Sequence, residues 1–343
     1  MNKKTIPILA GSFLLTGLGV YLYASKVEAR NYKLETVRVT TYGGGPDEID
    51  AQGIASALGN GSHGDTNKSE NGVHASSVPR STDAKTYRIL HLSDLHLSEP
   101  ESHKLRFLEQ ITDDDFDFVV LTGDVFENYT GLKYANSLLS RRPKLGAYAV
   151  LGNHDYYNYS IFNKIAGRLN RRFRHPMVYR DVQPMINALQ NNGYDVLLNE
   201  SRTHEGVHVV GVDYPGIAQE ELTELVAKAP AGHMKLALFH MPRLLHYFEN
   251  AKVDFALGGH THGGQIRIPG FGAIITDSEL SRHEASGLIH RGKTTFHISR
   301  GLSADPRSNF RLFCPPAATI IEVTHKPNAA HPEKHLVSSA TIA

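Results

Sequence analysis

Seven side chains that could coordinate metal ions are spread through the middle of the chain. They are carboxylates, one amide and imidazoles, with no thiolate among them: Asp94, His96, Asp124, Asn153, His240, His260 and His262. Such a mixed set of donors suits divalent first-row metals, Mn²⁺ first and Fe or Zn as alternatives, better than a soft metal or an iron–sulfur cluster. Because seven donors are too many for one small cation, they predict two metals about 3.5–4 Å apart that share a carboxylate and a water. Two metals so placed hold the attacking and leaving oxygens of an in-line phosphoryl transfer.

Each group of donors follows a short apolar run. Runs rich in Val, Ile, Leu and Phe and bounded by turn residues predict buried strands. The runs, each followed directly by a polar cluster, are residues 88–92, 118–122, 147–151, 235–239 and 255–257. Helical segments predicted at 103–112 and 132–141 lie between them, which indicates an α/β domain. In such sheets ligands collect at the carboxyl ends of the strands, where all of the donors stand.

The polar clusters, in chain order, are SDLH, GD, GNHD, a lone His at a strand end and GHTH. Together they resemble the calcineurin-like metallophosphoesterase superfamily over residues 86–325. The resemblance implies a metallophosphoesterase-type β-sandwich flanked by α-helices, with layers in the order α-β-β-α. It implies one metal held by Asp94, His96 and His262, a second held by Asn153, His240 and His260, and Asp124 as the bridge between them. Because no ligand of the family pattern is missing, a non-catalytic relative is disfavoured.

The resemblance also implies a mechanism. Two divalent cations lower the pKa of a bridging water enough to leave hydroxide near neutral pH. That hydroxide would attack phosphorus while the cations neutralise charge on the non-bridging oxygens. His154 resembles the family's proposed general acid, which protonates the departing oxygen, and Asp155 is expected to fix its tautomer. The alternative for His154 is a hydrogen bond that only orients a ligand.

Simpler explanations exist for each residue taken alone. A single Asp or His at a strand end is usually a cap or a loop residue with local hydrogen bonds, but seven matching positions outweigh that explanation for the set. Gly258 and Gly259 either give their loop flexibility or let the backbone approach a metal closely. Of the 20 histidines, five enter this interpretation. We expect the others, His91 and His297 among them, to be packed or at the surface.

A basic segment after the GNHD motif could contact substrate. Apolar residues at four-residue steps predict an amphipathic helix over residues 161–173. The candidate substrate-binding residues are arginines of this segment and one in the later GQIRIPGFG motif: Arg168, Arg171, Arg172, Arg174 and Arg267. A basic amphipathic helix suits an anionic membrane surface or a diphosphate group. The alternative is a helix that packs on the core and leaves a solvated basic face.

The N-terminal end carries an apolar run of 19 uncharged residues at positions 6–24. As a helix, such a run nearly spans a hydrocarbon core of about 30 Å. We therefore expect one transmembrane helix within residues 1–29, with a cleaved signal peptide as the alternative. Lys3 and Lys4 precede the run, whereas four cations follow it within residues 26–38. By the positive-inside rule, this excess predicts a single-pass protein of the bacterial inner membrane with a cytoplasmic catalytic domain.

The remaining segments are assigned by composition. Residues 30–85 are expected to hold an edge strand at 37–40 and then a flexible tether or long surface loop rich in Gly, Ser, Asn and Asp. We expect residues 86–325 to form one catalytic domain and residues 326–343 to form a disordered tail. The 36 Lys and Arg residues balance 35 Asp and Glu residues, so no global basic field indicates a nucleic-acid partner.

Taken with the anchor, the motifs FHMP and GGHTHGGQIRIPGFG resemble the membrane-attached bacterial branch of the superfamily, which includes UDP-2,3-diacylglucosamine hydrolases. The resemblance implies a membrane lipid or a lipid-linked nucleotide as substrate. Hydrolysis of the diphosphate of UDP-2,3-diacylglucosamine, a step of lipid A synthesis, would yield lipid X and UMP. The alternatives are a broad-specificity membrane-bound phosphodiesterase or lipid phosphatase, and a non-catalytic membrane-docked module.

Overall fold

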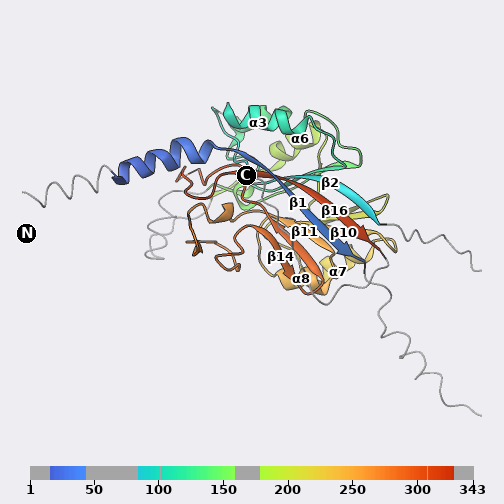
Figure 1. The fold of residues 1–343 in the computed structure, drawn as a ribbon. Helices are drawn as coiled ribbons and strands as arrows, with labels where there is room; N and C mark the ends of the chain where they lie inside the picture. The colour runs from blue at the N-terminus through green and yellow to red at the C-terminus, as the bar shows by residue number, and fades with distance from the viewer. Residues whose placement is uncertain (1–15, 44–83, 101, 159–177, 307, 328–343) are drawn as a thin grey trace, which may run out of the picture.

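Two six-stranded sheets form the centre of the molecule (Figure 1). The structure, a computed structural model, describes residues 16–43, 84–100, 102–158, 178–306 and 308–327. The first sheet has the order β1 (Lys33–Tyr42), β16 (Ala317–Lys326), β2 (Lys85–Leu92), β3 (Phe118–Thr122), β4 (Gly146–Val150), β7 (Asp195–Val196). The second has the order β14 (Gly287–Arg291), β15 (Thr294–Ile298), β11 (Phe255–Gly258), β10 (Met234–Leu238), β9 (Val207–Gly211), β8 (Glu200–His204). Both sheets are mixed, and β2, β3 and β4 run parallel, as do β9, β10 and β11.

Alternate residues of the central strands pack in opposite directions. Phe118 and Val120 of β3 join the core between the two sheets, whereas Val119 and Leu121 join a core shared with helices α3, η3 and α6. In the second sheet, Phe296 of β15 packs outward in the same way against α7 and α8. These helices are α3 (His103–Thr112), η3 (Tyr129–Leu138), α6 (Gln183–Asn191), α7 (Gln219–Ala227) and α8 (Leu245–Asn250). The four layers confirm the predicted α/β sandwich with helices on both outer faces.

The predicted elements agree with the observed ones where the donors stand. The five predicted strands correspond to β2, β3, β4, β10 and β11, and the helix predicted at 103–112 is α3. The helix predicted at 132–141 was wrong in type and position, because this segment is the 3-10 helix η3, which begins three residues earlier. The side chain of Asn128 sets that start, since it accepts a hydrogen bond from the Thr130 N–H at 3.0 Å. The basic helix predicted at 161–173 lies outside the described residues.

The N-terminal segment leads into the edge of the first sheet. Residues 16–22 form an α-helix that continues into a π-helical turn, Tyr23–Val27, and a 3-10 turn, Glu28–Arg30. Strand β1 follows and pairs with β16 at the sheet edge, over a longer range than the predicted 37–40. Within the described ranges, no helix is both long enough and apolar enough to cross a membrane. Parts of the predicted anchor, tether and tail lie outside those ranges: residues 6–15, 44–83 and 328–343.

Two buried histidines join the sheets across their shared interface. His91 of β2 and His297 of β15 place their Nδ1 atoms 2.9 Å apart, and His91 Nε2 lies 2.8 Å from Thr122 Oγ1. Burial is the largest effect on both rings. It lowers the pKa of His297 to about 4 and lowers the pKa of His91 well below its ordinary value. Both rings are therefore neutral near neutral pH, and the Nδ1–H of one ring donates a hydrogen bond to Nδ1 of the other.

We predict that this pair makes folding less favourable as the pH falls. Between the ordinary histidine pKa of 6.5 and the folded value of about 4, the unfolded chain binds protons that the folded protein does not, so the free energy of unfolding decreases with decreasing pH. His297→Asn should reduce that dependence by up to about 1.4 kcal/mol per pH unit, as measured by urea denaturation across this interval. His246→Asn, at an exposed position of α8, is the control. Equal slopes for wild type and His297→Asn would contradict the prediction.

Candidate metal centre

Loops at the carboxyl ends of strands in both sheets bring the predicted donors together. Asp94 and His96 follow β2, Asp124 follows β3, Asn153 starts the short helix α4 (Asn153–Tyr156) after β4, His240 follows β10, and His260 and His262 follow β11. Two groups form in which the ligand atoms all lie within 4.8 Å of one another: Asp94, His96 and His262 in one, and Asp124, His240 and His260 in the other. Asn153 joins the second group, because its Oδ1 lies 3.1 Å from His240 Nε2. The structure thus brings all seven predicted donors together at these strand ends.

Asp124 stands between the two groups. Its Oδ2 lies 3.3 Å from Nε2 of His240 and 3.7 Å from Nε2 of His96, while its Oδ1 accepts the backbone N–H of His154 at 2.8 Å. Among the residues that the structure describes, Asp124 Oδ2 and His96 Nε2 are buried without a hydrogen-bond partner. A buried carboxylate oxygen is costly to leave uncompensated. Divalent cations therefore fit this arrangement, and Asp124 is placed to share its carboxylate between two of them.

Three of the imidazoles are held so that Nε2 points into the centre. The Nδ1 of His240 lies 2.7 Å from the carbonyl oxygen of Thr122, and the Nδ1 of His262 lies 2.8 Å from that of Ser303. Since a carbonyl oxygen only accepts, each Nδ1 carries a proton, and Nε2 is the ring atom left to bind a metal. His96 is held in the same way, with Nδ1 2.9 Å from a carboxylate oxygen of Glu127.

The backbone of the centre is strained. Five of the seven predicted donors adopt positive φ angles: Asp94 (51°), His96 (41°), Asp124 (52°), His260 (73°) and His262 (51°). Such a conformation costs of order 1–3 kcal/mol for a residue other than glycine and persists only where the surroundings impose it. Hydrogen bonds between the loops impose it here, since Ser303 N–H donates to Asp94 O and His96 N–H donates to Asp124 O, both at 2.9 Å. The fold therefore keeps the donors in place at a cost in stability.

The charges at the centre favour an anionic bridge. Burial alone would raise the pKa of Asp124, but His240 and His154 hold it well below its usual range. Conversely, burial would lower the pKa of His240, but Asp124 raises it to about 9. Burial and then the charge of His240 lower the pKa of His260 to about 3, so its ring stays neutral. A negative carboxylate among imidazoles that can give up their protons is an arrangement that attracts cations.

Glu127 is a member of the site that the sequence interpretation missed. Its Oε2 lies 2.9 Å from Nδ1 of His96 and 3.3 Å from Nδ1 of His154. Burial would raise the pKa of Glu127, but hydrogen bonds from His154 and His96 lower it to about 2. A second carboxylate three residues after Asp124, in the segment GDVFE, was the available signal.

The expectation that Asp155 fixes the tautomer of His154 was wrong. The Asp155 carboxylate instead accepts backbone N–H groups of Gly152 at 2.8 Å, Asp124 at 2.9 Å and Phe126 at 3.3 Å. Its position in the first turn of α4 directs it toward these amides, so that it joins the loops after β3 and β4. The carboxylate beside His154 Nδ1 is that of Glu127.

The two glycines before His260 have different roles. A Cβ atom at Gly259 would lie 1.9 Å from Ser93 Oγ and 2.7 Å from Asp94 Oδ2, so the backbone approaches both side chains closely. A Cβ at Gly258 would meet the ring of Phe239 at 2.4 Å, which is a packing requirement of the strand. Of these two glycines, only Gly259 lies against a predicted metal donor.

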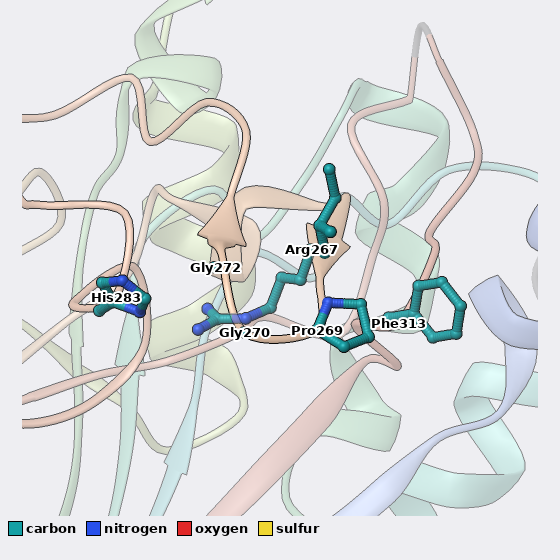
Figure 2. A pocket seen from close by; sticks show the side chains of 7 residues that line it. Arg267, Pro269, Gly270, Gly272, His283 and Phe313 are labelled. Atoms are coloured by element: carbon teal, nitrogen blue, oxygen red, sulfur yellow. The ribbon is translucent and has the colours of Figure 1, made fainter.

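Of the predicted substrate-binding arginines, only Arg267 lies within the described residues; Arg168, Arg171, Arg172 and Arg174 lie outside them. Arg267 lies in β12 (Arg267–Ile268) and lines a cavity of about 230 Å³ together with Pro269, His283 and Phe313. Its Nη1 donates to the carbonyl of Gly263 at 3.2 Å. In Figure 2 its guanidinium points toward His283, and the ring of Phe313 lies on the other side of Pro269. The contact with Gly263 ties Arg267 to the loop that carries His262.

We predict that Glu127→Gln weakens metal binding by about 10- to 100-fold, because the neutral amide no longer favours the His96 tautomer that presents Nε2. The measurement is calorimetric titration of metal-stripped protein with Mn²⁺, with circular dichroism as a check on folding. Glu220→Gln, at an exposed position of α7, removes a surface carboxylate and should bind Mn²⁺ as wild type does. Wild-type affinity in the Glu127 variant would contradict the assigned role.

Comparison with known proteins agrees with this geometry. A family model described as calcineurin-like phosphoesterase matches residues 87–264, about half of the chain. The metallophosphoesterase YkoQ of Bacillus subtilis (strain 168) is 29% identical over 248 residues, which cover 70% of this chain and 84% of that protein. UDP-2,3-diacylglucosamine pyrophosphatase LpxG of Chlamydia muridarum (strain MoPn / Nigg) is 26% identical over 279 residues, with the same coverage of 70% and 84%. The chain therefore belongs to the calcineurin-like phosphoesterase family of metal-dependent phosphohydrolases.

Proposed function

We propose that the chain hydrolyses the diphosphate bond of UDP-2,3-diacylglucosamine, releasing lipid X and UMP. The observation that carries the hydrolytic assignment is the position of Asp124 Oδ2 between the two groups of donors. The substrate is supported by two similar proteins named UDP-2,3-diacylglucosamine pyrophosphatase, from Chlamydia muridarum and Chlamydia trachomatis. Two Mn²⁺ ions are the proposed cofactors; when bound, they would activate water and neutralise charge on the phosphate oxygens.

The chain's own residues supply orientation and a proton in this proposal. His154 is buried beside the centre, with its ring edge-on to that of His96 at a centroid distance of 4.7 Å. The carboxylate of Glu127 lies 3.3 Å from Nδ1 of His154, and with both ring nitrogens protonated the imidazolium would donate its Nε2 proton to the departing oxygen. The backbone of His154 also orients Asp124 through its N–H. Removing the ring therefore leaves the support of Asp124 intact.

We predict that His154→Ala lowers turnover by about 10²- to 10⁴-fold while the bound metal, measured by elemental analysis, stays near the wild-type content. Asp124→Asn, by contrast, should lose metal as well as activity, because it removes the charge that faces both groups. His246→Ala is the surface control. Loss of metal from His154→Ala would reassign this residue to support of the ligands.

We propose that residues 1–29 anchor the protein in the bacterial inner membrane with the catalytic domain in the cytoplasm. The uncharged run at 6–24 and the four cations after it support this placement. Residues 16–24 are the described part of that run, and residues 16–22 form an α-helix. Protease treatment of spheroplasts should leave the catalytic domain intact until the membrane is permeabilised. Digestion of the domain from outside would overturn the orientation.

The substrate is tested with the purified full chain and Mn²⁺. UDP-2,3-diacylglucosamine in mixed micelles should yield UMP, detected by chromatography, and Asp124→Asn should yield none. Bis-p-nitrophenyl phosphate and lipid phosphates serve as comparison substrates. Hydrolysis of the comparison substrates without UMP release would reject the proposed substrate and favour a phosphodiesterase or lipid phosphatase of broad specificity.

A further inference from the structure

Five large apolar side chains are exposed close to the metal centre. Ile268, Phe271, Ile274, Ile275 and Phe313 are 46–60% exposed, and together they are called the apolar rim below. Phe313 also has a φ of 53°, a strained conformation for a bulky residue. An exposed aromatic ring on a strained backbone contributes little to folding. Exposed apolar residues that gather in this way mark a contact surface.

The rim is part of a fixed structure and not a set of isolated side chains. Strands β12 and β13 (Gly272–Ala273) pair as a short hairpin, and Ile274 N–H donates to Ile266 O at 3.1 Å. Arg267 N–H donates to Leu312 O at 3.0 Å, which places Phe313 beside the hairpin (Figure 2). The first strand of the hairpin begins five residues after the predicted metal donor His262, and Gln265 N–H between them donates to His262 O. The rim is therefore connected directly to the loop that carries His262.

The N-terminal helix is attached to the same place. Arg311 N–H donates to Ala24 O at 3.0 Å, and Cys314 N–H donates to a carboxylate oxygen of Glu28 at 2.6 Å. These two bonds flank Phe313 along the chain. In Figure 1 the blue N-terminal helix extends away from the sheets before the chain enters β1. The end of the N-terminal helix therefore lies beside the part of the chain that carries Phe313.

The exposed residues of the N-terminal helix indicate what covers the apolar rim. Val20, Tyr21, Leu22 and Tyr23 are consecutive and each is 46–53% exposed. At about 100° per residue, four consecutive positions cover every side of a helix, so this helix is apolar all round. A helix that docks in a protein groove keeps a polar face, whereas an all-apolar exposed helix suits lipid. The hydroxyl of Ser25 is satisfied by Tyr21 O at 2.7 Å, as a lipid environment requires.

The charges around the rim suit a lipid headgroup layer. The guanidinium of Arg282 lies 4.0 Å from the ring centroid of Phe271, and Arg267 lines the cavity beside Phe313. Lys26 and Arg30 follow the apolar helix in sequence. Cations and aromatic rings at the border of an apolar surface are typical of segments that enter the interface of a bilayer.

We infer that the apolar rim inserts into the bilayer surface beside the N-terminal helix and holds the metal centre against the headgroups. An acylated substrate could then reach the centre with its chains still in the membrane. Only the delivery of an acylated substrate rests on the proposed function. The insertion itself is a separate property of the surface and is measured separately.

Insertion is tested on the full chain reconstituted in vesicles of phosphatidylethanolamine with phosphatidylglycerol as the minor component. Phe271→Cys and Ile275→Cys are labelled with the fluorophore NBD, and Glu224→Cys on α7 is the matched control, since α7 lies away from the N-terminal helix in Figure 1. The buried Cys314 of the wild type controls for background labelling. The two rim labels should shift to shorter wavelength and be quenched by lipids brominated in their acyl chains, while the control label should not.

Two outcomes would overturn the inference. Rim labels that stay solvent-exposed in the reconstituted protein would show that only the helix contacts lipid. A blue shift without lipid that grows with protein concentration would assign the rim to a second copy of the chain. Both outcomes are independent of catalysis.

Catalysis supplies a second measurement. Phe271→Asp should lower UMP release from UDP-2,3-diacylglucosamine in vesicles by about tenfold and leave hydrolysis of bis-p-nitrophenyl phosphate unchanged. Thr223→Asp on α7 is the control for added charge. Equal loss on both substrates would make the effect structural and reject the role of the rim in delivery. If wild type hydrolyses the diester but not the lipid nucleotide, the proposed substrate fails, and the fluorescence measurement still decides the insertion.

Discussion

The buried carboxylate of Asp124 is the constraint on which the arrangement of both sheets depends. It follows a strand of the first sheet, yet its Oδ2 faces His240 from the second sheet as well as His96 from the first. Burying this charge is unfavourable, and the surrounding imidazoles are what hold its pKa low. The two sheets must stack with these strand ends at a common edge, because only then do donors from both sheets reach the same oxygen. The positive φ angles of the ligand loops follow from that requirement.

Much of the fold and of the donor set could be predicted from the sequence. Each donor motif stands directly after an apolar run, and such a run bounded by turn residues folds as a buried strand in most contexts. The order of the strands could not be predicted in the same way. Strand β16 lies between β1 and β2, and pairing between segments so distant in sequence leaves no periodic signal. The start of η3 was missed because the capping residue Asn128 begins the helix three residues before the predicted position.

The partners of the donors were harder to predict than the donors. Asp155 was expected to contact His154 because it is adjacent in sequence, but the first turn of a helix directs its carboxylate to backbone amides. Glu127 reaches both His96 and His154 because its chain neighbour Phe126 bridges to Leu97. His91 and His297, whose roles the sequence left open, meet across the interface between sheets. Contacts of this kind depend on tertiary packing, which local sequence does not specify.

Arg311 connects the N-terminal helix to the metal centre. Its guanidinium is fully buried and donates to the carbonyls of His262 at 3.1 Å and Arg300 at 2.7 Å, while its backbone N–H donates to Ala24 O. Burial lowers the pKa of Arg311, because removing the charged guanidinium from water is unfavourable. Such a cost is sustained because one side chain supports several loops at once. The end of the N-terminal helix and the backbone of His262 are therefore joined through one buried residue, Arg311.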